Sequence, residues 1–273
     1  MSKIYEQENH RQRSFNIIKH LRLMDDIFFR CCLKDNIPVA ECMLRIILAK
    51  HDLKIITMQV EYVIPSLQGR SVRLDVHAID NSGKEYDIEM QRADKGASQK
   101  RARFNSSLLD LNSLKKGEDF TKLPETYVIF ITENDVLGKG SPRYHINRFV
   151  EEGMTPFNDG AHIIFVNGSY EGQDDIGKLM HDFRSRNADD ILLEPLKETV
   201  NRYKNNPEEV SVMDKELQAW LNEERAAGEA QGTEKTQMSS IRALMKNAGV
   251  TAEKAMELLS IDKSLWQKYL AML

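Results

Sequence analysis

The clearest pattern of hydrophobic and polar positions lies between Ser71 and Arg92, where apolar and polar residues alternate on both sides of a turn cluster. A period of two predicts a β-hairpin, because successive side chains of a strand point to opposite faces. The apolar rows are Val72, Leu74, Val76 and Ala78, and then Tyr86, Ile88 and Met90. The polar rows are Arg73, Asp75 and His77, and then Glu85, Asp87, Glu89 and Gln91.

The turn of this hairpin determines which residues face each other. Residues 81–83 read Asn-Ser-Gly and suit a three-residue loop in which Gly83 adopts the left-handed conformation. Asp80 then faces Lys84. The same register pairs Asp75 with Glu89, His77 with Asp87 and Arg73 with Gln91.

The predicted pairing of Asp75 with Glu89 brings two carboxylates together. Directly opposed residues of an antiparallel pair have Cβ atoms about 4.5–5.5 Å apart, so both carboxylates can reach one ion. Without a cation they repel and raise each other's pKa. Their oxygen atoms favour Mg²⁺ or Mn²⁺ over zinc. The alternative is that the acidic row is the solvated face of a half-exposed hairpin, and spacing alone does not separate the two interpretations.

The rest of the first two hundred residues predicts alternating helices and strands. Helices are expected over 21–34, 39–49, 98–111, 174–186 and 188–203, and further strands over 55–64, 126–132 and 161–166. Pro65 should end the first of these strands. We expect Leu108, Leu109 and Leu111 to be buried. His145 and His162 are isolated in the sequence and are interpreted as structural. This order predicts an α/β fold with a mixed sheet flanked by helices.

The C-terminal part of the chain has a different character. We place a boundary after Asn206, which divides the chain into a core domain (1–206), a charged helical linker (207–236) and a small helical module (237–273). Fewer than about 40 residues rarely bury enough surface to fold alone. The module is therefore expected to dock on the core or to form a homo-oligomer. A helix-turn-helix is disfavoured, because no helix is clearly basic.

Composition narrows the class of protein. Of 273 residues, 41% are hydrophobic and 29% are charged, which is ordinary for a globular protein. The net charge of -4 argues against a surface coated in nucleic-acid contacts. Three cysteines without metal-type spacing indicate neither a disulfide framework nor a zinc site. No apolar run is long enough to cross a membrane, so we expect a soluble cytoplasmic protein.

Two segments of the hairpin carry a family resemblance. Residues 70–75 (Arg-Ser-Val-Arg-Leu-Asp) and 86–91 (Tyr-Asp-Ile-Glu-Met-Gln) resemble the Asp…Glu-x-Gln core of the recombination-promoting nucleases, a transposase-like family of the PD-(D/E)XK nuclease superfamily. Similar family features occur in residues 26–30, at Gly69-Arg70 and in the basic residues 100–104. The resemblance covers roughly residues 20–200.

The resemblance implies a restriction-endonuclease-like core and a metal-dependent DNA endonuclease. Asp75 and Glu89 would hold Mg²⁺, with Mn²⁺ as a possible replacement. Gln91 stands where the wider superfamily usually has lysine, and as a neutral amide it can orient water but cannot stabilise negative charge as an ammonium does. Lys100 is the candidate for the missing positive charge.

Two further acidic residues are considered. Asp26 is interpreted as a helix cap rather than a metal ligand, because carboxylates suit the start of a helix. Glu41 is either an additional acidic site residue or a solvated glutamate on an amphipathic helix.

The rival function is a non-catalytic DNA-binding or oligomerising regulatory protein that retains the nuclease fold. Both functions predict a folded core. They differ in whether Asp75 and Glu89 bind a metal ion.

Overall fold

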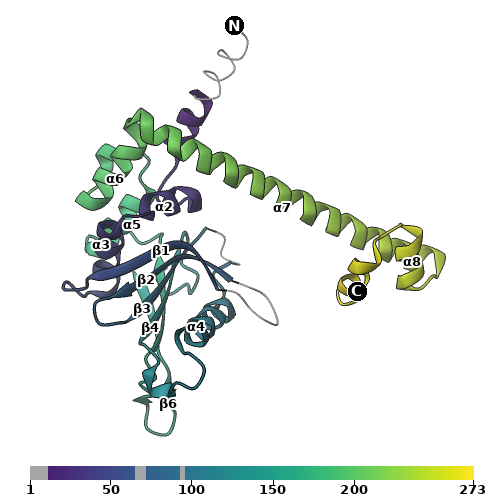
Figure 1. Cartoon of the computed structure of the whole chain (residues 1–273), viewed down its shortest axis with the longest axis horizontal. Coiled ribbons are helices and arrows are strands. Elements are labelled where there is room, and N and C mark those ends of the chain that lie inside the picture. Colours follow the sequence, from purple (N-terminus) through teal and green to yellow (C-terminus); the bar gives the residue numbers. More distant parts are fainter. Residues whose placement is uncertain (1–11, 65–71, 93–95) are drawn as a thin grey trace. The chain divides into compact units, whose positions relative to one another are not determined.

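The computed structural model describes residues 12–64, 72–92 and 96–273 (Figure 1). Gly69 and Arg70, which contribute to the family resemblance, and Pro65, the predicted strand end, lie outside these ranges. The chain separates into two compact units, with the division between Glu216 and Leu217. The predicted division into 1–206, 207–236 and 237–273 stays a prediction.

The first unit contains the predicted alternation of helices and strands. Residues 12–20 are helical. The helices that follow are α2 (Asp26–Leu33), α3 (Ile37–Leu48), α4 (Gln99–Ser113), α5 (Asp175–Arg184) and α6 (Glu194–Asn205), with short 3₁₀ turns η2 (Phe120–Lys122) and η3 (Ala188–Asp190). The strands are β1 (Ile55–Ile64), β2 (Val72–Asp80), β3 (Glu85–Gln91), β4 (Thr126–Thr132), β5 (Arg143–Ile146), β6 (Phe149–Val150), β7 (Thr155–Pro156) and β8 (Ala161–Asn167).

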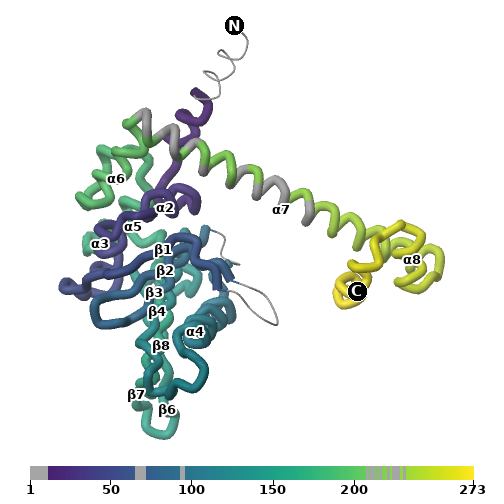
Figure 2. The backbone as a smooth tube through the Cα atoms, in the orientation of Figure 1, coloured from purple at the N-terminus to yellow at the C-terminus, as the bar shows by residue number. Residues whose placement is uncertain are grey.

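Six strands form one mixed sheet in the order β1-β2-β3-β4-β8-β5. The pairs β1/β2, β2/β3 and β5/β8 are antiparallel, whereas β3/β4 and β4/β8 are parallel. Figure 2 traces β3, β4 and β8 as neighbours in the middle of the sheet. Every residue of β4 is buried, as expected for a parallel strand covered on both faces. The predicted restriction-endonuclease-like α/β fold is confirmed.

Helices cover the sheet on both faces (Figure 1). On one face, α4 packs over β4 and β8, and α2 and α3 contact the strands from the other. The α4 face has a core that includes Leu74, Leu108, Leu109 and Phe130. Burial of Leu111 was predicted wrongly, since it is 72% exposed. It lies two residues after Leu109, about 200° around the helix and so on the solvent side.

The hairpin turn follows the sequence prediction. Gly83 has φ +81°, and its amide donates to the Asp80 carbonyl at 3.0 Å. The Asp80 amide donates to the Lys84 carbonyl at 3.0 Å, so these two residues face each other. His77 pairs with Asp87, also as predicted.

The short strands β5, β6 and β7 were not predicted. They carry too few residues for a periodic signal, and β5 completes the sheet only by pairing with β8. This pairing brings His145 Nε2 within 3.1 Å of His162 Nδ1. The two histidines, which are isolated in the sequence, are therefore neighbours in the fold, and their interpretation as structural stays a prediction.

The second unit is helical. It includes most of α7 (Pro207–Ala248), followed by α8 (Ala252–Leu258), the 3₁₀ turn η4 (Lys263–Leu265) and α9 (Trp266–Leu270). Gly249 ends α7 with φ +64°, and the Thr251 side chain caps α8 by accepting from the Lys254 amide. The apolar side chains of this unit form one core, which includes Met238, Ile241, Ala255, Met256 and Tyr269.

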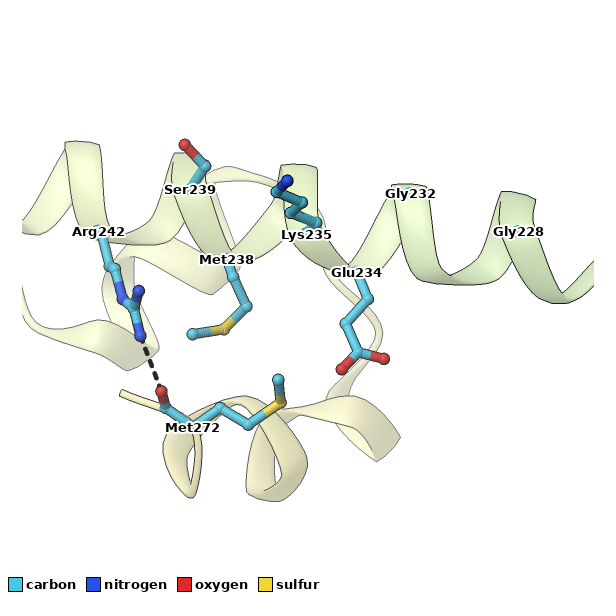
Figure 3. Close-up of a pocket in the computed structure, with 8 residues that line it drawn as sticks. All are labelled: Gly228, Gly232, Glu234, Lys235, Met238, Ser239, Arg242 and Met272. Atoms are coloured by element: carbon cyan, nitrogen blue, oxygen red, sulfur yellow. Dashed lines mark hydrogen bonds between the residues drawn. The ribbon is translucent and has the colours of Figure 1, made fainter. Parts of the chain in front are cut away.

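A pocket of about 830 Å³ lies in this second unit (Figure 3). Its lining includes Glu234, Met238, Arg242 and Met272, and Arg242 Nη2 donates to the Met272 carbonyl at 2.9 Å. None of the predicted site residues lines it. Among the described helices of the whole chain, none combines the length and apolar character needed to span a bilayer.

Candidate active site

Asp75 and Glu89 meet where the regular pairing of β2 with β3 stops. Backbone pairs run from Ile79–Glu85 to Val76–Ile88. Beyond them, the Asp75 amide donates to Glu89 Oε1 at 3.3 Å, and the Met90 amide donates to Asp75 Oδ2 at 2.9 Å. Each acidic side chain therefore reaches across to the backbone of the opposite strand.

The predicted pairing of Arg73 with Gln91 is not formed. Arg73 pairs with Val63 of β1, and its guanidinium lies 3.5 Å from Glu61 Oε1. Gln91 instead pairs with Thr132 of β4. The hairpin register holds as far as the pair Val76–Ile88 and is lost from Asp75 on, so the predicted register pairing of Asp75 with Glu89 is not formed either, although the two residues remain in contact.

The alternation of side chains along β2 changes at Asp75. Leu74 belongs to the core beneath α4, whereas Val76 pairs with Ile88, which points to the other face of the sheet. The predicted common face for Leu74 and Val76 was therefore wrong. On the neighbouring strand, Glu61 has φ +55°, a region unusual for a residue with a side chain. The sheet is irregular where the acidic pair lies.

Helix α4 covers the acidic row of β3. Asn105 Nδ2 donates to Asp87 Oδ2 at 3.0 Å, and Arg101 Nη2 donates to Glu89 Oε2 at 2.5 Å. Asp87 is 0% exposed and Glu89 is 1% exposed. The alternative that this row is a solvated face is wrong for these two carboxylates.

Burial makes the charged forms of these carboxyl groups less stable, because too few positive charges and hydrogen-bond donors surround them. Burial and the nearby Glu89 raise the pKa of Asp75 to about 8. Burial also raises the pKa of Asp87 and of Glu89, although Arg101 opposes the shift of Glu89. Within the described residues, Asp87 Oδ1 is buried without a hydrogen-bond partner. A buried acidic cluster with an unsatisfied oxygen costs folding stability, which is a common property of functional sites.

Arg101 links two of the predicted site residues. Besides Glu89, its guanidinium donates to Gln91 Oε1 at 2.7 Å and to the Gly96 carbonyl at 3.2 Å. A Cβ on Gly96 would lie 2.1 Å from the Gln91 amide carbon, so a glycine is required for Gln91 to lie where it does. The position of the Arg101 guanidinium thus depends on Gln91, at the end of β3, and on Gly96, which follows that strand.

The sequence prediction selected Lys100 as the additional cation, but the residue that contacts the site is Arg101. Lys100 is exposed. A signal for Arg101 was present, because it lies one turn before Asn105 and two turns before Leu108 on the buried face of α4. Helical phase would have favoured Arg101 over its neighbour.

Helix α2 adds a further carboxylate near the pair. Asp25 is the residue at the N-cap position and Asp26 is the first helical residue, so the prediction of Asp26 as the cap was wrong. The negative charge of Asp26 contributes to raising the pKa of both Asp75 and Glu89. Arg30, 3.8 Å from Asp26, acts in the opposite direction on Asp75.

Comparison with known families identifies this region. Residues 41–169 match the family model described as PD-(D/E)XK nuclease family transposase. Over this segment the chain is similar to that family. The matched segment includes the strands that carry Asp75, Glu89 and Gln91 and confirms the resemblance drawn from the sequence. Neither the curated proteins nor the solved structures contain a match to the chain.

Glu41, the first residue of the matched segment, has structural contacts. It accepts from Arg45 Nη2 at 2.7 Å and from the Ile55 amide at 2.9 Å. These bonds join α3 to the start of β1. They account for Glu41 without a role beside Asp75.

The chemistry of the carboxylates at this site would suit one hard divalent ion. Across residues 12–64, 72–92 and 96–273, no group of three or more His, Cys, Asp or Glu side chains is arranged to hold a metal. Mg²⁺, however, usually keeps several waters and binds through one or two carboxylates together with substrate phosphates. Asp75 and Glu89, with raised pKa values and oxygen ligands, suit that mode.

Proposed function

We propose that the chain is a Mg²⁺- or Mn²⁺-dependent endonuclease that hydrolyses phosphodiester bonds of DNA in recombination or transposition, acting in the cytoplasm. The observation that carries this proposal is the reciprocal contact of Asp75 and Glu89, in which each carboxylate accepts from the opposite strand. The similarity of residues 41–169 to a nuclease family supports the class of reaction.

Asp75 and Glu89 are the residues proposed to hold the ion. When bound, a divalent ion polarises the scissile phosphate and lowers the pKa of its water. The amides of Asp75 and Met90 orient the two carboxylates, since each donates to one of them. Because a carboxylate must lose its proton to bind a metal, the raised pKa of Asp75 makes activity rise towards alkaline pH.

Gln91 is proposed to orient the attacking water. Its Oε1 accepts from Arg101, which leaves the amide nitrogen as a donor. A neutral amide cannot stabilise developing negative charge as a lysine ammonium can. The positive charge at this end of the sheet comes instead from α4.

Plasmid nicking tests the proposal. Purified full-length protein is incubated with supercoiled DNA and Mg²⁺ or Mn²⁺, beside Asp75→Asn and Glu89→Gln. Each substitution is expected to lower the nicking rate by about 10³-fold or more, because it removes one of two ion ligands. The matched control is Glu85→Gln, which changes another partly buried carboxylate of β3 and should retain most of the activity.

Nicking that survives both substitutions would overturn the site assignment. If no metal supports cleavage while DNA is still bound, the chain is the rival non-catalytic DNA-binding or oligomerising protein. The presence of Gln91 at the usual lysine position favours keeping this second candidate. Light scattering of full-length protein would then show whether the proposed module 237–273 mediates self-association.

A further inference from the structure

The Arg101 guanidinium lies where Glu89 would meet a metal ion. Glu89 Oε2 accepts from Arg101 Nη2 at 2.5 Å, while Glu89 Oε1 accepts from the Asp75 amide at 3.3 Å. Both oxygens of this carboxylate are therefore engaged, one of them by a full positive charge. An ion that binds Oε2 must approach on the side of the guanidinium or replace it.

The position of Arg101 is fixed by more than one contact. Gln91 Oε1 and the Gly96 carbonyl accept from Nη1 at 2.7 Å and 3.2 Å, and the guanidinium carbon lies 5.5 Å from the centre of the Phe130 ring. A planar guanidinium can bridge two acceptors in this way, whereas an ammonium is a point charge. Arg101 is thus held in place as the cation of Glu89.

The environment of Arg101 also permits it to leave. Its side chain is 38% exposed, whereas Glu89 is 1% exposed. Moving the guanidinium outward does not require the helix to shift, but leaving Glu89 charged without any cation would be costly. A divalent ion can take over that compensation.

We infer that Arg101 is the resident countercation of Glu89 in the metal-free protein and that a divalent ion binds by displacing it. The inference rests on the proposed function, because it assumes Glu89 to be a metal ligand. Its consequence is specific: an arginine next to the site weakens metal binding. A purely structural arginine that stabilises the site would have the opposite effect.

Calorimetric titration of the full-length protein with Ca²⁺ tests this inference. Ca²⁺ is an oxygen-binding ion, and omitting DNA separates binding from cleavage. The titration is made above the pKa of Asp75, which lies at about 8. Arg101→Gln is expected to bind Ca²⁺ about tenfold more tightly than the wild type, because a charge-assisted hydrogen bond no longer competes.

Two further variants define the effect. Arg101→Lys should bind with an affinity between those of the wild type and Arg101→Gln, because an ammonium cannot bridge Glu89 and Gln91 in the same way. Arg103→Gln removes the same charge from an exposed position of α4 and should leave the affinity unchanged. If Arg101→Gln does not fold by circular dichroism, Arg101→Lys decides the question in the same direction.

The outcomes separate the inference from the proposed function. If Arg101→Gln binds Ca²⁺ no more tightly than the wild type while Glu89→Gln weakens binding, the inference is overturned and the metal site stands. If Glu89→Gln binds as well as the wild type, or if no variant binds, the proposed metal site itself fails. If Arg103→Gln gains as much affinity for Ca²⁺ as Arg101→Gln does, the effect is one of general charge, and the inference is also overturned.

Discussion

Asp75 and Asp80 lie on the same strand, five residues apart, in opposite electrostatic situations. Asp80 is 5% exposed and accepts from the Tyr86 hydroxyl at 2.7 Å, the Ser82 amide and hydroxyl at 2.8 Å each, and the Lys84 amide at 3.0 Å. Burial alone would raise the pKa of Asp80, but these donors lower it. Asp75 is partly buried beside a second carboxylate, and its pKa rises to about 8.

The number of donors around each carboxylate makes the difference. At the turn end of the hairpin, a closed set of hydrogen bonds satisfies the charge of Asp80 and stabilises the fold. At the other end, the strand pairing stops and Asp75 and Glu89 face each other. The first arrangement contributes stability, whereas the second costs stability, a cost that the proposed binding of a cation would offset.

The largest expected effect comes from removing the hydrogen-bonded carboxylate at the turn end of the hairpin. Asp80→Ala should lower the free energy of unfolding by about 3–4 kcal/mol, because it leaves the buried Tyr86 hydroxyl and the turn amides without their acceptor. Urea denaturation measures the change. Asp80→Asn is the matched control and should cost about half as much, since an amide oxygen still accepts. A loss below about 1 kcal/mol in Asp80→Ala would contradict the assignment.

The next effect concerns Asp75, at the other end of the hairpin, and is a pH dependence of the free energy of unfolding. The pKa of Asp75 in the folded protein lies above its ordinary value, so the folded state holds its proton longer than the unfolded state does. In metal-free protein the free energy of unfolding should therefore fall as pH rises from about 4 to about 8.

Asp75→Asn should remove the part of the decrease in unfolding free energy that the ionisation of Asp75 causes. In EDTA near pH 8, the variant should be about 1–2 kcal/mol more stable than the wild type. The slope should shrink rather than vanish, because the pKa values of Asp87 and Glu89 are also raised. If the free energy of unfolding changes with pH in the same way for both proteins, the charged form of Asp75 is not destabilised in the folded state.

The smallest effect comes from a satisfied carboxylate that is partly exposed. Glu125 Oε2 lies 2.5 Å from Lys84 Nζ. Burial opposes the shift, but hydrogen bonds from Lys84 and Tyr127 lower the pKa of Glu125. Its contribution should be present above the ordinary glutamate pKa and lost as pH falls through the lowered value. Glu125→Gln should cost about 0.5–1 kcal/mol at neutral pH and less under acid conditions, as urea denaturation would measure. An equal cost at both pH values would contradict a charge effect.

The local part of the candidate site could be predicted from the sequence. Alternation along 72–80 and 85–91 indicated both strands, and Gly83 indicated the turn that sets their register. Those signals depend on neighbouring residues only, because strand parity and left-handed turn residues are properties of short segments. They suffice to bring Asp75 towards Glu89.

Several contacts could not be predicted in this way. Burial of the acidic row depends on α4, whose first turn lies about ten residues beyond β3. The pair of His145 and His162 depends on an edge strand too short to show a period. The irregularity at Asp75 adjoins Glu61 on another strand. Each arises from packing between separate elements.

By itself, the sequence determined the order of the longer helices and strands, the hairpin and its turn, and the similarity of residues 41–169 to a nuclease family. Only the tertiary structure decided that Arg101 rather than Lys100 meets Glu89, and that two acidic side chains are buried rather than solvated. The physical reason is that periodicity states which side chains share a face. What covers that face, and with which charge, depends on distant segments that meet only when the chain folds.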